Sequence, residues 1–80
     1  MNKNIIVTGG LGFIGSNLID LLIKKNFHVI NIDKVNYSSN FYNVKNFKFK
    51  KNYKFIKCDI GDLKKIPKIL YKYKPKVIFN

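Results

Sequence analysis

A glycine-rich segment near the start of the chain does most to limit the folds that it can adopt. Residues 8–15 read TGGLGFIG and separate two stretches of different periodicity. The run Asn4–Thr8 is mostly β-branched and apolar, as in a strand that is buried on both faces. From Phe13 to Lys25 apolar residues recur at helical spacing, and Asp20 and Lys24 are placed for an ion pair. The sequence therefore predicts a strand, a tight turn and a helix, in that order.

The rest of the chain alternates between the same two kinds of pattern. The expected elements are strands at 27–33, 53–58 and 76–79, a helical turn near 40–46, and a helix from Asp62, its cap, to Pro75. Pro67 removes one hydrogen bond from that helix unless the helix starts there. Such alternation predicts an α/β fold with a parallel sheet and right-handed crossovers. The expected strand order is 3-2-1-4, the incomplete N-terminal half of a doubly wound, Rossmann-type sheet.

Apolar stripes predict which side of each helix faces the sheet. In the first helix the stripe is expected at Ile14, Leu18, Leu21 and Leu22. In the last helix it is expected at Leu63, Ile66, Ile69, Leu70 and Tyr73. Asn26 tolerates a left-handed conformation, so it is the expected terminator of the first helix.

The composition indicates one small domain with no membrane or secretion signal. Eighty residues, 46% of them hydrophobic, can form one domain, 1–80, with a marginal core. No apolar run approaches the length of a membrane span, and the N-terminus does not read as a signal peptide. Cys58 is the only cysteine, which excludes a disulfide framework and suits a reducing compartment. The expected location is therefore the cytoplasm.

A net charge of +12 raises the possibility of nucleic-acid binding. All 16 basic residues are lysines, however, and they are scattered along the chain. Arginine, which is preferred for bidentate contacts to bases and phosphates, is absent. Tyrosine and phenylalanine residues between the lysines of 45–54 could stack on bases, although such residues more often cover a small sheet. A basic nucleic-acid-binding module remains the less favoured alternative, and no metal site is expected.

The glycine turn has the features of a phosphate-binding site. Gly9 allows a tight reversal at positive φ, and Gly12 has no side chain to keep a pyrophosphate from the backbone. Gly15 lets the helix pack closely on the first strand. Phe13 and Ile14 would contribute backbone N–H groups at the positive end of the helix. No Lys-Ser/Thr pair closes the segment, so a nucleoside-triphosphatase loop is excluded, while a tight turn that binds nothing is the alternative.

Acidic residues follow at the ends of the next two strands. Asp33 can accept hydrogen bonds from both hydroxyls of an adenosine ribose and would repel a 2′-phosphate, so NAD is favoured over NADP. Asp59 could accept from the adenine amino group, while Ile60 offers an apolar face. The alternative is a solvated strand-end aspartate for Asp33 and an ordinary loop aspartate for Asp59. His28 and Cys58 are expected to be structural.

Together these residues resemble the extended short-chain dehydrogenase/reductase family. The motif at 8–15, Asp33, the Asp59–Ile60 pair and the strand from Lys74 to Phe79 carry the resemblance along the whole chain. Within that family the loop at 33–40, DKVNYSSN, looks most like the dTDP-glucose 4,6-dehydratases. The resemblance implies NAD as cofactor, held by Gly9, Gly12, Phe13, Ile14, Asp33, Lys34, Asn36, Asp59 and Ile60.

The resemblance also implies what the whole enzyme does. It would be a homodimeric lyase that oxidises C4 of a nucleotide sugar, eliminates water across C5 and C6 and returns the hydride to C6. The family's catalytic residues, among them a Tyr-x-x-x-Lys pair, and its sugar-nucleotide domain are expected beyond Asn80. We therefore expect residues 1–80 to be an NAD-binding half-domain without turnover of its own, and unstable or aggregation-prone alone. The N-terminal part of a nucleotide-sugar 4-epimerase, or of another extended member, is the alternative.

Overall fold

Four strands alternate with helical segments along the chain. The computed structural model describes residues 3–35 and 40–80. In chain order the elements are β1 (Asn4–Thr8), α1 (Phe13–Lys24), β2 (His28–Asp33), the 3-10 helix η1 (Phe41–Val44), β3 (Tyr53–Lys57), α2 (Lys65–Tyr73) and β4 (Val77–Phe79). Each element lies where the sequence patterns predict it, with ends that differ by a few residues.

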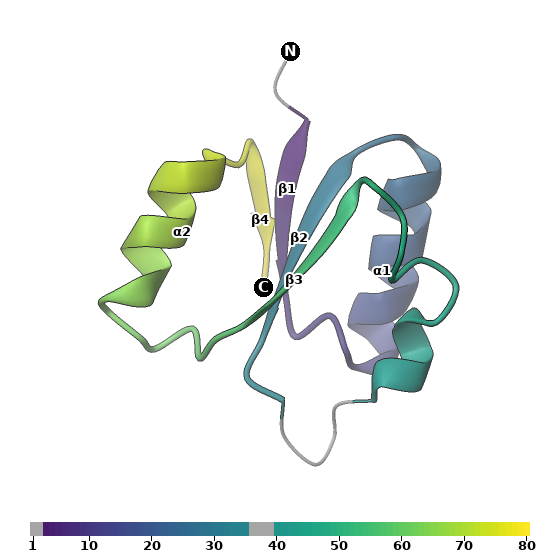
Figure 1. The fold of residues 1–80 in the computed structure, drawn as a ribbon, viewed down its shortest axis with the longest axis horizontal. Coiled ribbons are helices and arrows are strands. Elements are labelled where there is room, and N and C mark those ends of the chain that lie inside the picture. Colours follow the sequence, from purple (N-terminus) through teal and green to yellow (C-terminus); the bar gives the residue numbers. More distant parts are fainter. Residues whose placement is uncertain (1–2, 36–39) are drawn as a thin grey trace.

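The strands form one parallel sheet in the order β3-β2-β1-β4, which confirms the predicted Rossmann-type arrangement (Figure 1). At the centre of the sheet, Ile6 of β1 is paired with Ile30 of β2 on one side and Ile78 of β4 on the other. Because all four strands run in the same direction, their carboxyl ends meet at one edge. The glycine turn leaves the sheet at that edge.

Helical segments cover both faces of the sheet, and α1 and η1 lie on the opposite side from α2 (Figure 1). The α1 side holds the larger core, in which Val7 and Val29 of the sheet pack with Ile19 of α1 and Phe47 after η1. On the other side a smaller core is covered by partly buried residues of α2, which has no buried residue of its own. Within residues 3–35 and 40–80, no helix has both the length and the apolar character needed to span a membrane.

The rotation of α1 differs from the predicted stripe. Ile14 is 83% exposed and Leu21 is 52% exposed, so placing them in the core was wrong. The side of the helix that is buried carries Ile19, Leu22 and Ile23 instead. These residues lie four, seven and eight positions after Gly15, on the same side of a helix. Because Gly15 packs against the turn, its side of α1 must face the sheet.

The ends of the helices follow from local chemistry. Asn26 ends α1 at a φ of 67°, as predicted, and Asp20 and Lys24 form an ion pair of 3.0 Å. Asp62 Oδ1 accepts the N–H groups of Lys64 and Lys65 at the start of α2. Pro67 lies in the first turn of α2, where its missing N–H costs nothing. Leu63 precedes this helix and is 87% exposed, so the prediction that it faces the core was wrong.

Candidate functional site

A crevice of about 320 Å³ opens at the carboxyl edge of the sheet. It brings together most of the residues that the sequence predicts for a cofactor site, namely Gly9, Gly12, Asp33, Lys34, Asp59 and Ile60. Thr8, Cys58 and Asn80 also line it, because they stand at or just beyond the ends of β1, β3 and β4. These residues were not predicted, although the rule that strand ends line a ligand crevice would have found them.

The glycine turn is held tightly between β2 and α1. Gly9 has a φ of 70°, as expected, and its N–H donates to the carbonyl of Ile32 in β2 at 2.8 Å. The N–H of Gly12 donates back to the carbonyl of Gly9 at 3.2 Å. A Cβ on Gly15 would lie 2.6 Å from the same carbonyl oxygen, so α1 can start here only with glycine at that position. The turn is therefore a fixed part of the fold.

The N-terminus of α1 adjoins the crevice and has no side-chain cap among the described residues. The N–H groups of Phe13 and Ile14 have no carbonyl partner within the helix, as at any helix start. The side chains of both residues are more than 70% exposed and do not line the crevice in the described part of the chain. The N-terminus of α1 can therefore bind a ligand through backbone N–H groups and the positive end of the helix dipole.

Asp33 joins the turn to the loop that follows β2. Its side chain is only 6% exposed. Oδ2 accepts the N–H of Leu11 at 3.1 Å, and Oδ1 accepts the N–H of Val35 at 2.8 Å. An ionised carboxylate can accept about four hydrogen bonds, so these two are compatible with a further bond to a ribose hydroxyl. Sequence reasoning did not predict this bridge, since no pattern reveals which backbone N–H a buried acid meets.

The loop after β3 supplies the other side of the crevice. Asp59 is exposed, and its Oδ1 accepts the N–H of Gly61 at 2.8 Å. Ile60 is 52% exposed and presents an apolar side chain. Lys34 is exposed at the end of β2, whereas Asn36 lies outside the described residues. The two residues predicted for adenine thus lie across the crevice from the glycine turn.

Acidic residues are concentrated at this edge of a strongly basic chain. The sequence has four acidic residues. Asp33 is the last residue of β2, Asp59 and Asp62 follow β3, and Asp20 lies in α1. The backbone N–H groups of Lys65 and Lys64 hold the pKa of Asp62 below its ordinary value of 3.8. Each of these three carboxylates accepts at least one backbone N–H group.

One Tyr-x-x-x-Lys spacing occurs in the chain, at Tyr53 and Lys57, but it is unsuited to the family's catalytic role. Both residues belong to β3, where four positions span about 13 Å, far more than one helical turn. Burial raises the pKa of the Tyr53 phenol, whereas proton transfer near neutrality requires a lowered one. The Tyr53 hydroxyl instead accepts a hydrogen bond from Asn31 at 3.1 Å.

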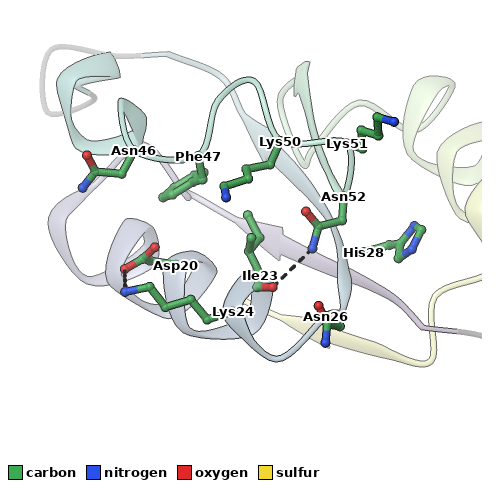
Figure 2. A pocket seen from close by; sticks show the side chains of 10 residues that line it. All are labelled: Asp20, Ile23, Lys24, Asn26, His28, Asn46, Phe47, Lys50, Lys51 and Asn52. Carbon is green, nitrogen blue, oxygen red and sulfur yellow. Dashed lines mark hydrogen bonds and ion pairs between the residues drawn. The ribbon is translucent and has the colours of Figure 1, made fainter.

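A second, larger cavity of about 670 Å³ lies at the opposite, amino edge of the sheet (Figure 2). Its walls are the C-terminal half of α1 and residues 46–52. Asn52 Nδ2 donates to the carbonyls of Ile23 and Phe27, at 3.3 and 2.9 Å, and so closes the end of α1. Lys50 and Lys51 bring positive charge to this cavity, but no glycine turn or helix N-terminus faces it among the described residues.

The parallel sheet, the glycine turn and the acid at the end of β2 together define a dinucleotide-binding half of the Rossmann type. Comparison with known proteins refines this class. The family model described as GDP-mannose 4,6 dehydratase matches residues 6–80. The chain belongs to that family, which confirms the resemblance to extended short-chain dehydrogenases/reductases.

Relatives of known name agree with this assignment. The chain is 44% identical over 79 residues to the dTDP-glucose 4,6-dehydratase of Haemophilus influenzae, covering 96% of this chain and 23% of the relative. The crystal structure of dTDP-glucose 4,6-dehydratase from Bacillus anthracis in complex with NAD aligns with a TM-score of 0.90 at 36% identity, over 95% of this chain and 25% of that one. UDP-glucose 4-epimerase from Thermotoga maritima aligns at 0.80 and 33% identity, over 94% and 22%. The chain thus spans about a quarter of the length of these relatives.

Proposed function

We propose that this chain is the NAD-binding N-terminal segment of a nucleotide-sugar 4,6-dehydratase that acts on dTDP-glucose or a similar sugar nucleotide. One observation carries the proposal: the glycine turn and the buried Asp33, which both line the crevice, are bonded to each other. The relatives named as dTDP-glucose 4,6-dehydratases, together with the neighbour crystallised with NAD, support the choice of reaction and cofactor.

The described residues fit the adenosine diphosphate part of NAD. At Gly12 an added Cβ would meet only the carbonyl of Gly9, at 3.4 Å, so the side facing the crevice is open to a pyrophosphate. The N–H groups of Phe13 and Ile14 would bind it at the helix start. Asp33 would accept a ribose hydroxyl and disfavour a 2′-phosphate, with Lys34 and Asn36 beside the ribose and Asp59 and Ile60 at the adenine. When bound, NAD supplies the hydride acceptor for oxidation of the sugar.

In this proposal the chain contributes cofactor binding, and the catalytic groups and the sugar site belong to other parts of the enzyme. Residues 1–80 would then be one NAD-binding half-domain. A cytoplasmic location suits a lone cysteine that is 5% exposed. A homodimeric enzyme is the state that the family resemblance implies.

A nucleotide-sugar 4-epimerase is the second candidate. The alignment with UDP-glucose 4-epimerase supports it, because the same half-domain serves both kinds of enzyme. The two differ in what happens to the sugar after oxidation at C4. A dehydratase removes water, whereas an epimerase returns the hydride to C4 of the same sugar.

Two measurements test the proposal. Isothermal titration calorimetry of the whole enzyme containing this chain, freed of bound nucleotide, should detect NAD binding, with NADP weaker by about tenfold or more because Asp33 opposes the extra phosphate. The whole enzyme containing this chain, incubated with dTDP-glucose and NAD, should give a product lighter by one water molecule. A product of unchanged mass that is epimeric at C4 would favour the second candidate, and equal affinity for NAD and NADP would contradict the role of Asp33.

A further inference from the structure

Asn31 is a buried polar residue in the middle of β2. Its side chain is 0% exposed and lies on the α1 side of the sheet, between Val29 and Asp33 in the alternation of the strand. Both ends of the amide have a partner. Oδ1 accepts the N–H of Gly10 at 2.9 Å, and Nδ2 donates to the hydroxyl of Tyr53 at 3.1 Å.

Gly10 lies directly against this amide. A Cβ at residue 10 would overlap Oδ1 of Asn31 and Cδ1 of Ile19. Glycine is therefore required at this position by the close approach of β2 and α1. The bond from Gly10 to Asn31 fills the place that a side chain would otherwise occupy.

Tyr53 fixes the orientation of the amide. Its hydroxyl faces Nδ2, which turns Oδ1 towards Gly10, and the flipped amide would set two donors against each other at Gly10. The ring of Tyr53 is held edge-on by Phe47, with centroids 4.9 Å apart. Burial raises the pKa of Tyr53, so its hydroxyl stays neutral over the working pH range.

Two neighbouring side chains of β2 thus hold two consecutive N–H groups of the turn. Asn31 takes the N–H of Gly10, and Asp33 takes the N–H of Leu11. Both of these N–H groups are directed into the protein. The N–H groups at the start of α1, from Phe13 onward, are then the ones presented to the crevice.

We propose that Asn31 is a positioning residue for the pyrophosphate of the cofactor, and that Tyr53 sets its orientation. This inference rests on the proposed function, since it assumes that the crevice binds a nucleotide diphosphate. Asn31 does not touch the ligand. It fixes the turn so that the N–H groups of α1 meet the phosphates without prior rearrangement.

The test compares ADP with adenosine as ligands of the whole enzyme containing this chain, freed of bound nucleotide and titrated by isothermal calorimetry. Adenosine engages only the ribose and adenine side of the crevice, whereas ADP also needs the turn. Asn31→Leu should weaken ADP binding by about tenfold while changing adenosine binding less than about twofold. Tyr53→Phe keeps the ring packing and should weaken ADP binding by about threefold, with adenosine again unchanged.

Asn52→Leu is the matched control, because Asn52 also bonds two groups of the chain but at the opposite edge of the sheet. It should lower stability without changing the ratio of ADP to adenosine affinity. Equal losses for both ligands in Asn31→Leu, or unchanged ADP binding, would overturn the positioning role. If Asn31→Leu does not fold, Tyr53→Phe decides in the same way. A folded wild-type enzyme that binds neither ADP nor NAD contradicts the proposed function, and the positioning role with it.

Discussion

The two edges of the sheet carry cavities of very different character. The cavity at the amino edge is about twice as large, at about 670 Å³ against about 320 Å³. Its walls are side chains such as those of Lys50, Lys51 and Asn52, and the last of these is engaged in closing α1. The smaller crevice is lined by the glycine turn next to the N-terminus of α1, by Asp33 and by the loop after β3.

From this difference we expect nucleotide binding to depend more on the arrangement of hydrogen-bond donors than on cavity volume. Backbone N–H groups held by a sheet and a helix keep their directions without a further entropic cost when a ligand binds. Exposed lysine side chains must be ordered at binding, and their attraction for anions is screened by salt. We therefore expect changes at the carboxyl edge to affect nucleotide binding far more than equivalent changes at the amino edge.

The largest effect is expected from Gly15→Ala. The new methyl would lie 2.6 Å from the carbonyl oxygen of Gly9, so the turn or α1 must move. We expect a loss of about 1–3 kcal/mol in the free energy of unfolding and no detectable NAD binding. Denaturant titration and calorimetry measure the two quantities.

Gly12→Ala is the matched control for the turn. At Gly12 the nearest atom to an added Cβ is 3.4 Å away, so the fold should tolerate the methyl while the pyrophosphate is obstructed. The stability should therefore stay within about 0.5 kcal/mol of wild type although NAD binding falls. Undiminished NAD binding in both variants would contradict the proposal that the glycine turn binds the pyrophosphate.

Asp33→Ala should have the next largest effect. It removes the acceptor of two backbone N–H groups and the expected ribose contact, so NAD affinity should fall by about tenfold or more and stability by about 2 kcal/mol. Discrimination against NADP should also be lost. Asp20→Ala makes the same change of charge at the other edge, where Asp20 pairs with the exposed Lys24. That control should change NAD affinity by less than about twofold and stability by less than about 0.5 kcal/mol.

A smaller and pH-dependent effect is expected from Asp62→Ala at the start of α2. The folded-state pKa of Asp62 lies below 3.8, so its contribution to stability is present above that value and is lost as pH falls through the lower, folded pKa. Wild type should be more stable than the variant at pH 7, and the gap should close in strong acid. Denaturant titrations at several pH values measure this difference in the free energy of unfolding. A difference that does not change with pH would contradict the role of Asp62 as the cap of α2.

The smallest effect is expected from the double substitution Lys50→Ala and Lys51→Ala in the larger cavity. It removes two exposed positive charges far from the crevice. NAD affinity at physiological salt should change by less than about twofold. A tenfold loss would show that the comparison of the two edges is wrong.

The features that could be predicted from sequence are those that depend on residues close together in the chain. The order of the sheet followed from strands alternating with helices, and Gly9 and Asp33 followed from the spacing around one turn. The rotation of α1 was mispredicted because hydrophobicity alone favoured Ile14, whereas contact of Gly15 with the turn decides which side is buried. The expected instability of the isolated chain stays a prediction.

The support behind the turn could not be predicted, because it depends on contacts between residues distant in sequence. Asn31 meets Gly10 and Tyr53 only once β2 lies beside β1 and β3. The one sequence feature that indicated a role for Asn31 was its polar side chain within an apolar strand. That feature does not reveal which groups Asn31 bonds.

The account is tested most directly by a ¹⁵N–¹H NMR titration with NAD of the whole wild-type enzyme that contains this chain, freed of bound nucleotide. We expect chemical-shift changes in the backbone N–H groups of residues 9–15, Asp33 and Asp59–Gly61, at the carboxyl edge of the sheet. The N–H groups of residues 46–52, around the larger cavity, should stay unperturbed. Shifts concentrated at residues 46–52, or none at any NAD concentration that saturates related enzymes, would contradict the claim that the glycine turn and Asp33 form the cofactor site.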